Sequence, residues 1–175
     1  MKSVRVDASF TDFVTARSTA LLRTAYLLTG DRGHAEDLLQ TALLRAARRW
    51  RSVQDAPEAY VRRILVNLSH DRRRLLFRRP REAPLPPDPD LVRGADAGLE
   101  RVAERDSVVA ALAALPVRQR QVIVLRYFED LSVDQTAELL RCTPGTVKSH
   151  ASRALSRLRE LLAADESEEV SCVHR

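Results

Sequence analysis

Apolar residues recur every three to four positions along most of this chain, which is the period of amphipathic helices rather than of strands. In the first half of the chain the pattern predicts three helices, over residues 9–28, 33–50 and 55–76. Asp55 and Glu58 have the spacing of a capping box at the start of the third helix. The residues expected to face inward in the first two helices are Phe10, Phe13, Val14, Leu21, Ala25, Leu28, Ala35, Leu38, Leu39, Ala42, Leu43 and Ala46. Glycines are few and β-branched runs are scarce, so the expected fold class is all-α.

Prolines divide this helical pattern into two parts. Five of the 8 prolines lie between residues 77 and 98, where they favour an extended chain over a helix. The helical period then returns, with helices expected over residues 99–115, from Pro116 onward and within 131–162. The sequence therefore predicts two small helical domains (1–76 and 99–164), a flexible Pro-rich linker between them (77–98) and an acidic tail (165–175).

The segment 131–162 is the most informative part of the chain. It has the pattern of a short helix, a tight turn and a longer helix, which is the helix-turn-helix that places its second helix in the DNA major groove. Ser132 is the expected N-cap of the first helix, and Thr143 caps the second, before Pro144. The second helix has an apolar face, formed by Val147, Ala151, Ala154, Leu158 and Leu161. Its other face carries Thr146, Ser149, Arg153, Ser156 and Arg157, whose hydroxyls and guanidinium groups suit base edges and phosphates.

The third helix offers a second candidate nucleic-acid surface. One face of it is apolar, with Val61, Ile64, Leu65, Leu68 and Leu75, and the opposite face carries Arg62, Arg63, Asn67, His70, Arg73 and Arg74. Such a ridge can follow phosphates while Asn67 reads a base edge. For this helix and for the helix-turn-helix, an ordinary solvated face is the alternative interpretation. Trp50 could stack on an unpaired base, but a lone tryptophan at a helix end is expected in the core.

Charge and composition narrow the classes of function. The net charge of +5 and the isoelectric point near 9.8 fit a polyanionic partner without proving one. No apolar stretch reaches the roughly 20 residues that span a bilayer, and the start of the chain lacks the apolar core of a secretion signal. Cys142 and Cys172 are too far apart to form a disulfide framework, so we expect a cytoplasmic protein. The usual catalytic, metal-binding and phosphate-binding motifs are missing from the sequence, so we expect no enzyme activity, catalytic residue, cofactor or metal.

Three stretches in combination resemble a known family. They are residues 30–40 (Gly-Asp-Arg-Gly-His-Ala-Glu-Asp-Leu-Leu-Gln), residues 57–74, and residues 115–122 together with the helix-turn-helix. Over nearly the whole chain, this combination resembles bacterial RNA polymerase sigma factors of the extracytoplasmic-function (ECF) type, group 4 of the sigma-70 family. The first two stretches resemble the family's second region, with its promoter-melting segment, and the third resembles its fourth region.

The resemblance implies an alternative sigma factor that binds core RNA polymerase, recognises the −35 and −10 promoter elements and promotes DNA melting. The residues implied to dock on the clamp of the large polymerase subunit are Glu36, Asp37, Leu38, Gln40 and Thr41. Those implied to contact the −10 element are Arg62, Arg63, Asn67, His70, Arg73 and Arg74, with the loop 51–55 receiving a base turned out of the duplex. Those implied to contact the −35 element are Thr143, Thr146, Lys148, Ser149 and Arg153. An anti-sigma factor is a further candidate partner, and no membrane contact is expected.

Two other classes of function stay open at this level. A free-standing helix-turn-helix regulator would need a ligand cavity or a dimer seam in its N-terminal domain, and the basic third helix argues against both. A helical adaptor that binds only protein would show no salt-dependent affinity for DNA.

Overall fold

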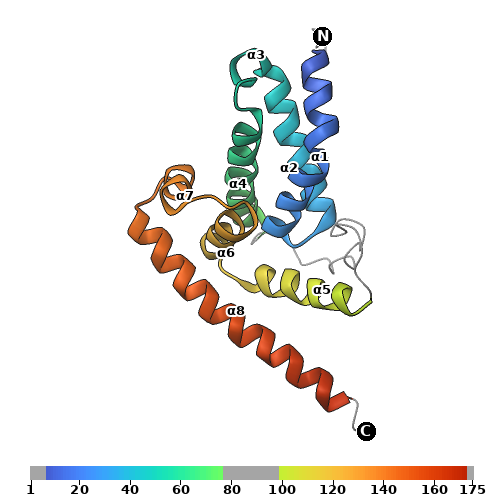
Figure 1. The fold of residues 1–175 in the computed structure, drawn as a ribbon, viewed down its shortest axis with the longest axis vertical. Coiled ribbons are helices and arrows are strands. Elements are labelled where there is room, and N and C mark those ends of the chain that lie inside the picture. Colours follow the sequence, from blue (N-terminus) through green and yellow to red (C-terminus); the bar gives the residue numbers. More distant parts are fainter. Residues whose placement is uncertain (1–6, 77–98, 173–175) are drawn as a thin grey trace. The chain divides into compact units, whose positions relative to one another are not determined.

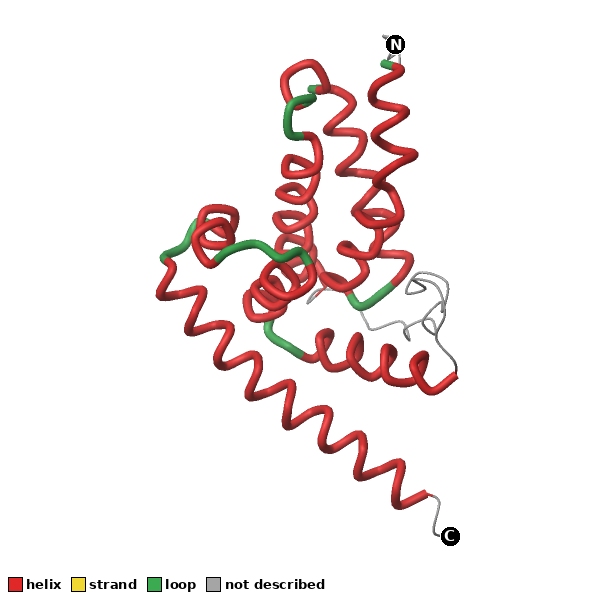
Figure 2. The backbone as a smooth tube through the Cα atoms, in the orientation of Figure 1, coloured by secondary structure: helices red, strands yellow, loops and turns green. Residues whose placement is uncertain are grey.

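The computed structural model describes residues 7–76 and 99–172, with side chains described over 7–70 and 107–163 (Figure 1). All the regular structure in these ranges is helical, as Figure 2 shows, so the all-α prediction is confirmed. The chain divides into two units, Met1–Pro86 and Pro87–Arg175. The Pro-rich linker that was expected over 77–98 lies outside the described residues.

Unit 1 is a bundle of three long helices. Its helices are α1 (Ala8–Thr29), α2 (Arg32–Arg48), the short α3 (Trp50–Val53) and α4 (Pro57–Leu76). The helices α1, α2 and α4 pack pairwise against one another, and α3 connects α2 to α4 (Figure 1). The apolar stripes of the long helices meet in a core that includes Leu21, Ala25, Leu28, Ala35, Leu38, Leu39, Ala42, Ala46, Val61, Ile64 and Leu65. Phe10, Phe13, Val14 and Leu43, also expected inward, are half-buried.

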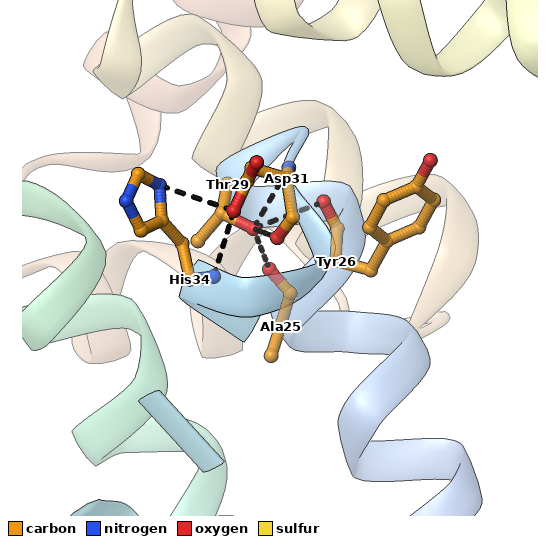
Figure 3. Close-up of polar contacts among 5 residues, drawn as sticks. All are labelled: Ala25, Tyr26, Thr29, Asp31 and His34. Atoms are coloured by element: carbon orange, nitrogen blue, oxygen red, sulfur yellow. Dashed lines mark hydrogen bonds and ion pairs between the residues drawn. The ribbon is translucent and has the colours of Figure 1, made fainter. Parts of the chain in front are cut away.

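The turn between α1 and α2 fixes where α2 begins. Gly30 has φ 72°, a left-handed conformation that suits glycine, and its N–H donates to the Tyr26 carbonyl over 2.7 Å. Figure 3 shows the Thr29 hydroxyl against the Ala25 carbonyl, 2.9 Å away. Asp31 then caps α2, because its Oδ1 accepts the His34 N–H over 2.8 Å. This turn anchors the N-terminal end of α2, where the expected polymerase-binding residues lie.

The connection from α2 to α4 differs from the expected pattern. The helix expected to continue to residue 50 ends at Arg48, and Trp50 begins α3 instead. Trp50 is only 6% exposed and lies against Phe10 and Phe13, with ring centroids 5.1 and 5.4 Å away. Burial of this large ring confirms that Trp50 belongs to the core.

The expected capping box at the start of α4 is wrong. The helix begins at Pro57, so Ala56 rather than Asp55 stands directly before it. The Glu58 carboxylate instead binds the guanidinium groups of Arg62, over 3.0 Å, and Arg17, over 3.2 Å. The Glu58 carboxylate therefore pairs with two guanidinium groups instead of accepting the backbone N–H that a capping box would supply.

Unit 2 contains the helix-turn-helix. Its helices are α5 (Leu99–Ala114), α6 (Val117–Ile123), which continues into a π-helical turn (Val124–Phe128), α7 (Val133–Leu140) and α8 (Pro144–Cys172). The long α8 packs on α5, α6 and α7. The core includes Val109, Leu112, Leu115, Val122, Ile123, Val124, Leu125, Ala137, Leu140, Val147 and Ala154.

A buried arginine ties the first two helices of unit 2 together. Arg120 of α6 is 6% exposed, and its Nη2 donates to the carbonyls of Ala113 and Leu115, the latter at 3.4 Å. A cation on the last carbonyls of α5 satisfies groups that a helix end leaves without a partner and complements the helix dipole. The contact holds the end of α5 against α6.

The last helix is longer than the sequence pattern suggested. The expected acidic tail, 165–175, is helical as far as Cys172, and residues 173–175 lie outside the described residues. No glycine or proline follows Gly145, so nothing in the sequence stops the helix at residue 164. Within the described ranges, no helix is long and apolar enough to cross a membrane.

Candidate nucleic-acid and polymerase interfaces

The turn between α7 and α8 has the geometry that the sequence indicated. Ser132 caps α7 by accepting the Gln135 N–H over 3.1 Å, and the Gln135 side chain accepts the Ser132 N–H over 2.7 Å, completing a capping box. Arg141, with φ 53°, ends α7 in a left-handed conformation. Thr143 then caps α8 by accepting the Thr146 N–H over 3.2 Å, ahead of Pro144. The helix-turn-helix prediction is confirmed.

The side chains expected to contact the −35 element fall on two flanks of α8. Thr146, Ser149 and Arg153 follow one another at helical spacing on one flank, and Ser149 and Arg153 are exposed. The Thr143 and Thr146 hydroxyls lie 2.9 Å apart at the start of this flank. Lys148 is also exposed but points to the other flank of the helix, because it is one residue, about 100°, away from Ser149.

The Lys148 flank borders a groove of about 390 Å³ within unit 2. Its walls come from α8, from the start of α7 and from the π-helical turn, and they include Arg126, Tyr127, Val133, Leu155 and Arg159. Tyr127 is 53% exposed there. Sequence patterning missed this groove because it lies between elements whose packing only the structure gives.

The expected basic ridge of α4 is exposed only in part. Val61, Ile64 and Leu65 are buried on the back of the helix, while Arg63 and Asn67 are exposed and His70 is half-buried. Arg62 departs from the expectation, because its side chain is only 14% exposed and is held by Glu58. The side chains of Arg73 and Arg74 lie outside the described ones, so their place on the ridge stays a prediction.

The loop expected to receive an unpaired base, residues 51–55, is partly helical, because residues 51–53 belong to α3 and only Gln54 and Asp55 form the turn that follows. Arg51, Ser52, Gln54 and Asp55 are exposed, whereas Val53 is half-buried. The ring of Trp50 is packed into α1 and offers no free face to a base. Any contact of this loop with DNA therefore has to come from its polar side chains and backbone.

The expected polymerase-binding patch on α2 needs one correction. Glu36, Asp37 and Gln40 are exposed, and Thr41 is half-buried. Leu38, however, is only 3% exposed and belongs to the core, so its side chain cannot meet a partner on this surface. The apolar side chain that does project from this face is Leu44, which is 58% exposed. It lies one helical turn beyond Gln40 and Thr41.

Comparison with known proteins gives the family. A model of "Sigma-70 region 2" matches residues 13–78, and a model of "Sigma-70, region 4" matches residues 105–158. The chain is 42% identical over 159 residues to the RNA polymerase sigma-E factor of Streptomyces coelicolor, covering 89% of this chain and 86% of that protein. It is 34% identical to the ECF RNA polymerase sigma factor SigE of Mycolicibacterium smegmatis, over 91% of this chain and 64% of that protein.

Solved structures agree with these relationships. The sigma factor RpoE of Bartonella quintana, in complex with the anti-sigma factor NepR, matches with a TM-score of 0.66 and 27% identity over 89% of this chain and 98% of that one. CnrH, in complex with the cytosolic domain of CnrY, matches in fold with a TM-score of 0.60 and 24% identity over 89% and 88%. The chain therefore belongs to the ECF group of the sigma-70 family and is an alternative RNA polymerase sigma factor.

Proposed function

We propose that the two units divide promoter recognition between them. Unit 1 holds core polymerase through α2 and the −10 element through α4, and unit 2 holds the −35 element through α8. One observation carries this assignment: α4 and α8 each bury an apolar face in their own unit and expose arginine together with amide or hydroxyl groups. A face of that chemistry neutralises phosphates and hydrogen-bonds base edges. RNA polymerase and promoter DNA are the partners that membership of this family implies.

For the −35 element, we assign base contacts to the flank of α8 that carries Thr146, Ser149 and Arg153. Arginine pairs with the O6 and N7 atoms of guanine through two hydrogen bonds, worth about 1–3 kcal/mol of discrimination. Thr143 lies at the N-terminal end of this flank, where hydroxyls and backbone N–H groups meet phosphates. Lys148, on the other flank, is assigned to the phosphate backbone.

For the −10 element, we assign contacts to Arg63, Asn67 and His70 on α4 and to the exposed loop 51–55. Extracting a base from the duplex costs a few kcal/mol, so the exposed polar groups of the loop and the ridge must together offset that cost. Arg62 is held by Glu58, so we assign it a supporting role in the ridge rather than the main contact with phosphate. Arg73 and Arg74 keep the −10 role implied by the sequence resemblance.

For core polymerase, we assign the contact to Glu36, Asp37, Gln40, Thr41 and Leu44, and the partner surface to the clamp of the large subunit. Charged and amide groups around one exposed leucine form the common plan of a protein interface, in which the apolar centre is buried and the polar rim sets the register. Leu38 supports this surface from beneath.

We also propose an anti-sigma factor as a regulatory partner and the cytoplasm as the place of action. The related RpoE of Bartonella quintana was solved bound to the anti-sigma factor NepR, which supports the first point. The second follows because bacterial transcription takes place in the cytoplasm. An initiation factor of this kind performs no covalent chemistry of its own.

Run-off transcription with purified core polymerase on a library of genomic fragments tests the proposed function. Adding the protein should produce start sites that core polymerase alone does not use, each preceded by a shared pair of sequence elements. A free-standing regulator or a protein-binding adaptor would add no start sites. That result, with polymerase known to be active, would refute the proposal.

A further inference from the structure

We propose that Ser9, on α1, is a positioning residue for promoter opening: it holds the indole of Trp50 and thereby fixes the loop 51–55. The proposal rests on the −10 role assigned to that loop above. Ser9 itself belongs to none of the DNA-binding or polymerase-binding sets, and no sequence motif points to it.

The contact joins residues that are far apart in the chain. Trp50 Nε1 donates to Ser9 Oγ over 2.7 Å, across 41 positions of sequence. The ring is packed against Phe10 edge-on, with planes at 75°, and against Phe13 at 40°. Aromatic packing of this kind fixes where the ring lies, but a hydrogen bond to its one polar atom also fixes how it is turned.

Ser9 is held in turn by the cap of α1. Its hydroxyl donates to Asp7 Oδ1 over 2.8 Å, and its backbone N–H reaches the same oxygen over 3.1 Å. These hydrogen bonds, the one from the Ser9 hydroxyl above all, lower the pKa of the Asp7 carboxyl, and the nearby Arg51 adds to the effect. The carboxylate, the hydroxyl and the indole therefore form a chain of hydrogen bonds from the α1 N-cap to the first residue of α3.

That chain ends where the loop begins. Trp50 is the first residue of α3, and Arg51, Ser52, Gln54 and Asp55 follow it with exposed side chains. The other end of the loop is tied to α4, because the Tyr60 N–H donates to the Ala56 carbonyl over 3.2 Å. Because both ends of the loop are held in place, its polar side chains have few arrangements. Less conformational entropy is therefore lost when the loop binds a base.

The test compares the wild type with four single variants and one double variant, all of full length and each bound to core polymerase on one selected promoter. Ser9→Ala removes the hydroxyl, and Trp50→Phe keeps a packed ring without the indole N–H. Ser9→Thr restores a hydroxyl. Ser18→Ala is the matched control, because Ser18 is also on α1 but bonds only the Val14 carbonyl of its own helix in the described contacts. Opening is followed by the reactivity of −10 thymines to permanganate, and closed-complex affinity is measured at low temperature.

Ser9→Ala should slow opening by about three- to tenfold, the cost of losing one hydrogen bond at a buried group. Closed-complex affinity should stay within about twofold, and Ser9→Thr and Ser18→Ala should open within about twofold of the wild type. The double variant of Ser9→Ala and Trp50→Phe should be no slower than the worse single variant, because both remove the same contact. Trp50 is the only tryptophan of the chain, so its emission and its quenching by acrylamide should change in Ser9→Ala and not in Ser18→Ala.

Unchanged opening in Ser9→Ala, an equal loss in Ser18→Ala, or additive effects in the double variant would each overturn the inference. So would a loss that closed-complex affinity accounts for in full. These outcomes are distinct from a failure of the proposed function, in which the wild-type protein would open no promoter with core polymerase.

Discussion

Leu44 is the residue whose change tests the polymerase surface most sharply. It is 58% exposed, so replacing it leaves the core of unit 1 untouched and should alter the free energy of unfolding by less than about 0.5 kcal/mol. Full burial of a leucine side chain is worth about 2 kcal/mol. Losing the exposed part of that side chain from an interface therefore costs about 1 kcal/mol, which is about a fivefold rise in Kd.

Binding of fluorescently labelled protein to core polymerase, followed by anisotropy, measures this effect. Leu44→Ala should weaken binding by about fivefold, and Leu44→Asp by more, because the interface would then have to desolvate a carboxylate. Arg23→Ala is the control, since Arg23 is also exposed but lies on α1 rather than on α2. Wild-type affinity in both Leu44 variants would show that α2 meets polymerase elsewhere or not at all.

Three further outcomes are expected. Leu38→Ala should destabilise unit 1 by about 2–5 kcal/mol in urea denaturation while leaving the polymerase affinity of the folded protein unchanged, because Leu38 is a core residue. Asn67→Ala should reduce run-off transcription from promoters with an intact −10 element by about five- to tenfold without weakening core binding. Run-off by this variant equal to that of the wild type would refute the base contact. The ionised Asp7 stabilises unit 1 because its pKa lies below the ordinary value of 3.8, so that stabilisation is complete above pH 3.8 and is lost as the pH falls through the lower, folded-state pKa. Relative to Asp7→Asn, the wild type should therefore lose stability in denaturation series below about pH 3.8; parallel curves would contradict this.

The periodic pattern predicted most of the helices because packing in a small helical unit depends on one apolar stripe per helix. The three long helices of unit 1 end within two residues of the expected bounds. The caps at Ser132 and Thr143 were also predictable, since each depends on a few neighbouring residues. Apolar stripes and helix caps depend on residues close together in the chain, so the sequence alone predicts them.

Contacts between distant residues account for what the pattern missed. Asp55 and Glu58 have the spacing of a capping box, but Arg17 on another helix takes part of the Glu58 carboxylate. The hydrogen bond between Trp50 and Ser9 joins α3 to α1, and no periodic pattern in the sequence indicates it.

The polymerase patch shows a different kind of error. Leu38 was expected both in the inward stripe of α2 and at the polymerase surface, and one side chain cannot serve both. The periodicity was correct and the assignment taken from the family resemblance was not, because a motif names positions without saying which of them face outward. Leu44, one turn beyond Gln40, is the apolar residue that the helix period places outward.

The most direct test of promoter recognition by two helical surfaces replaces one promoter element at a time. On a promoter that the protein and core polymerase use together, run-off transcription is measured after the −35 or the −10 sequence is scrambled and the rest is kept. We expect either replacement to reduce initiation strongly, and a −10 segment already unpaired to restore much of the loss when only the −35 element is scrambled. Initiation that survives the loss of either element would contradict recognition of the promoter by two separate helical surfaces.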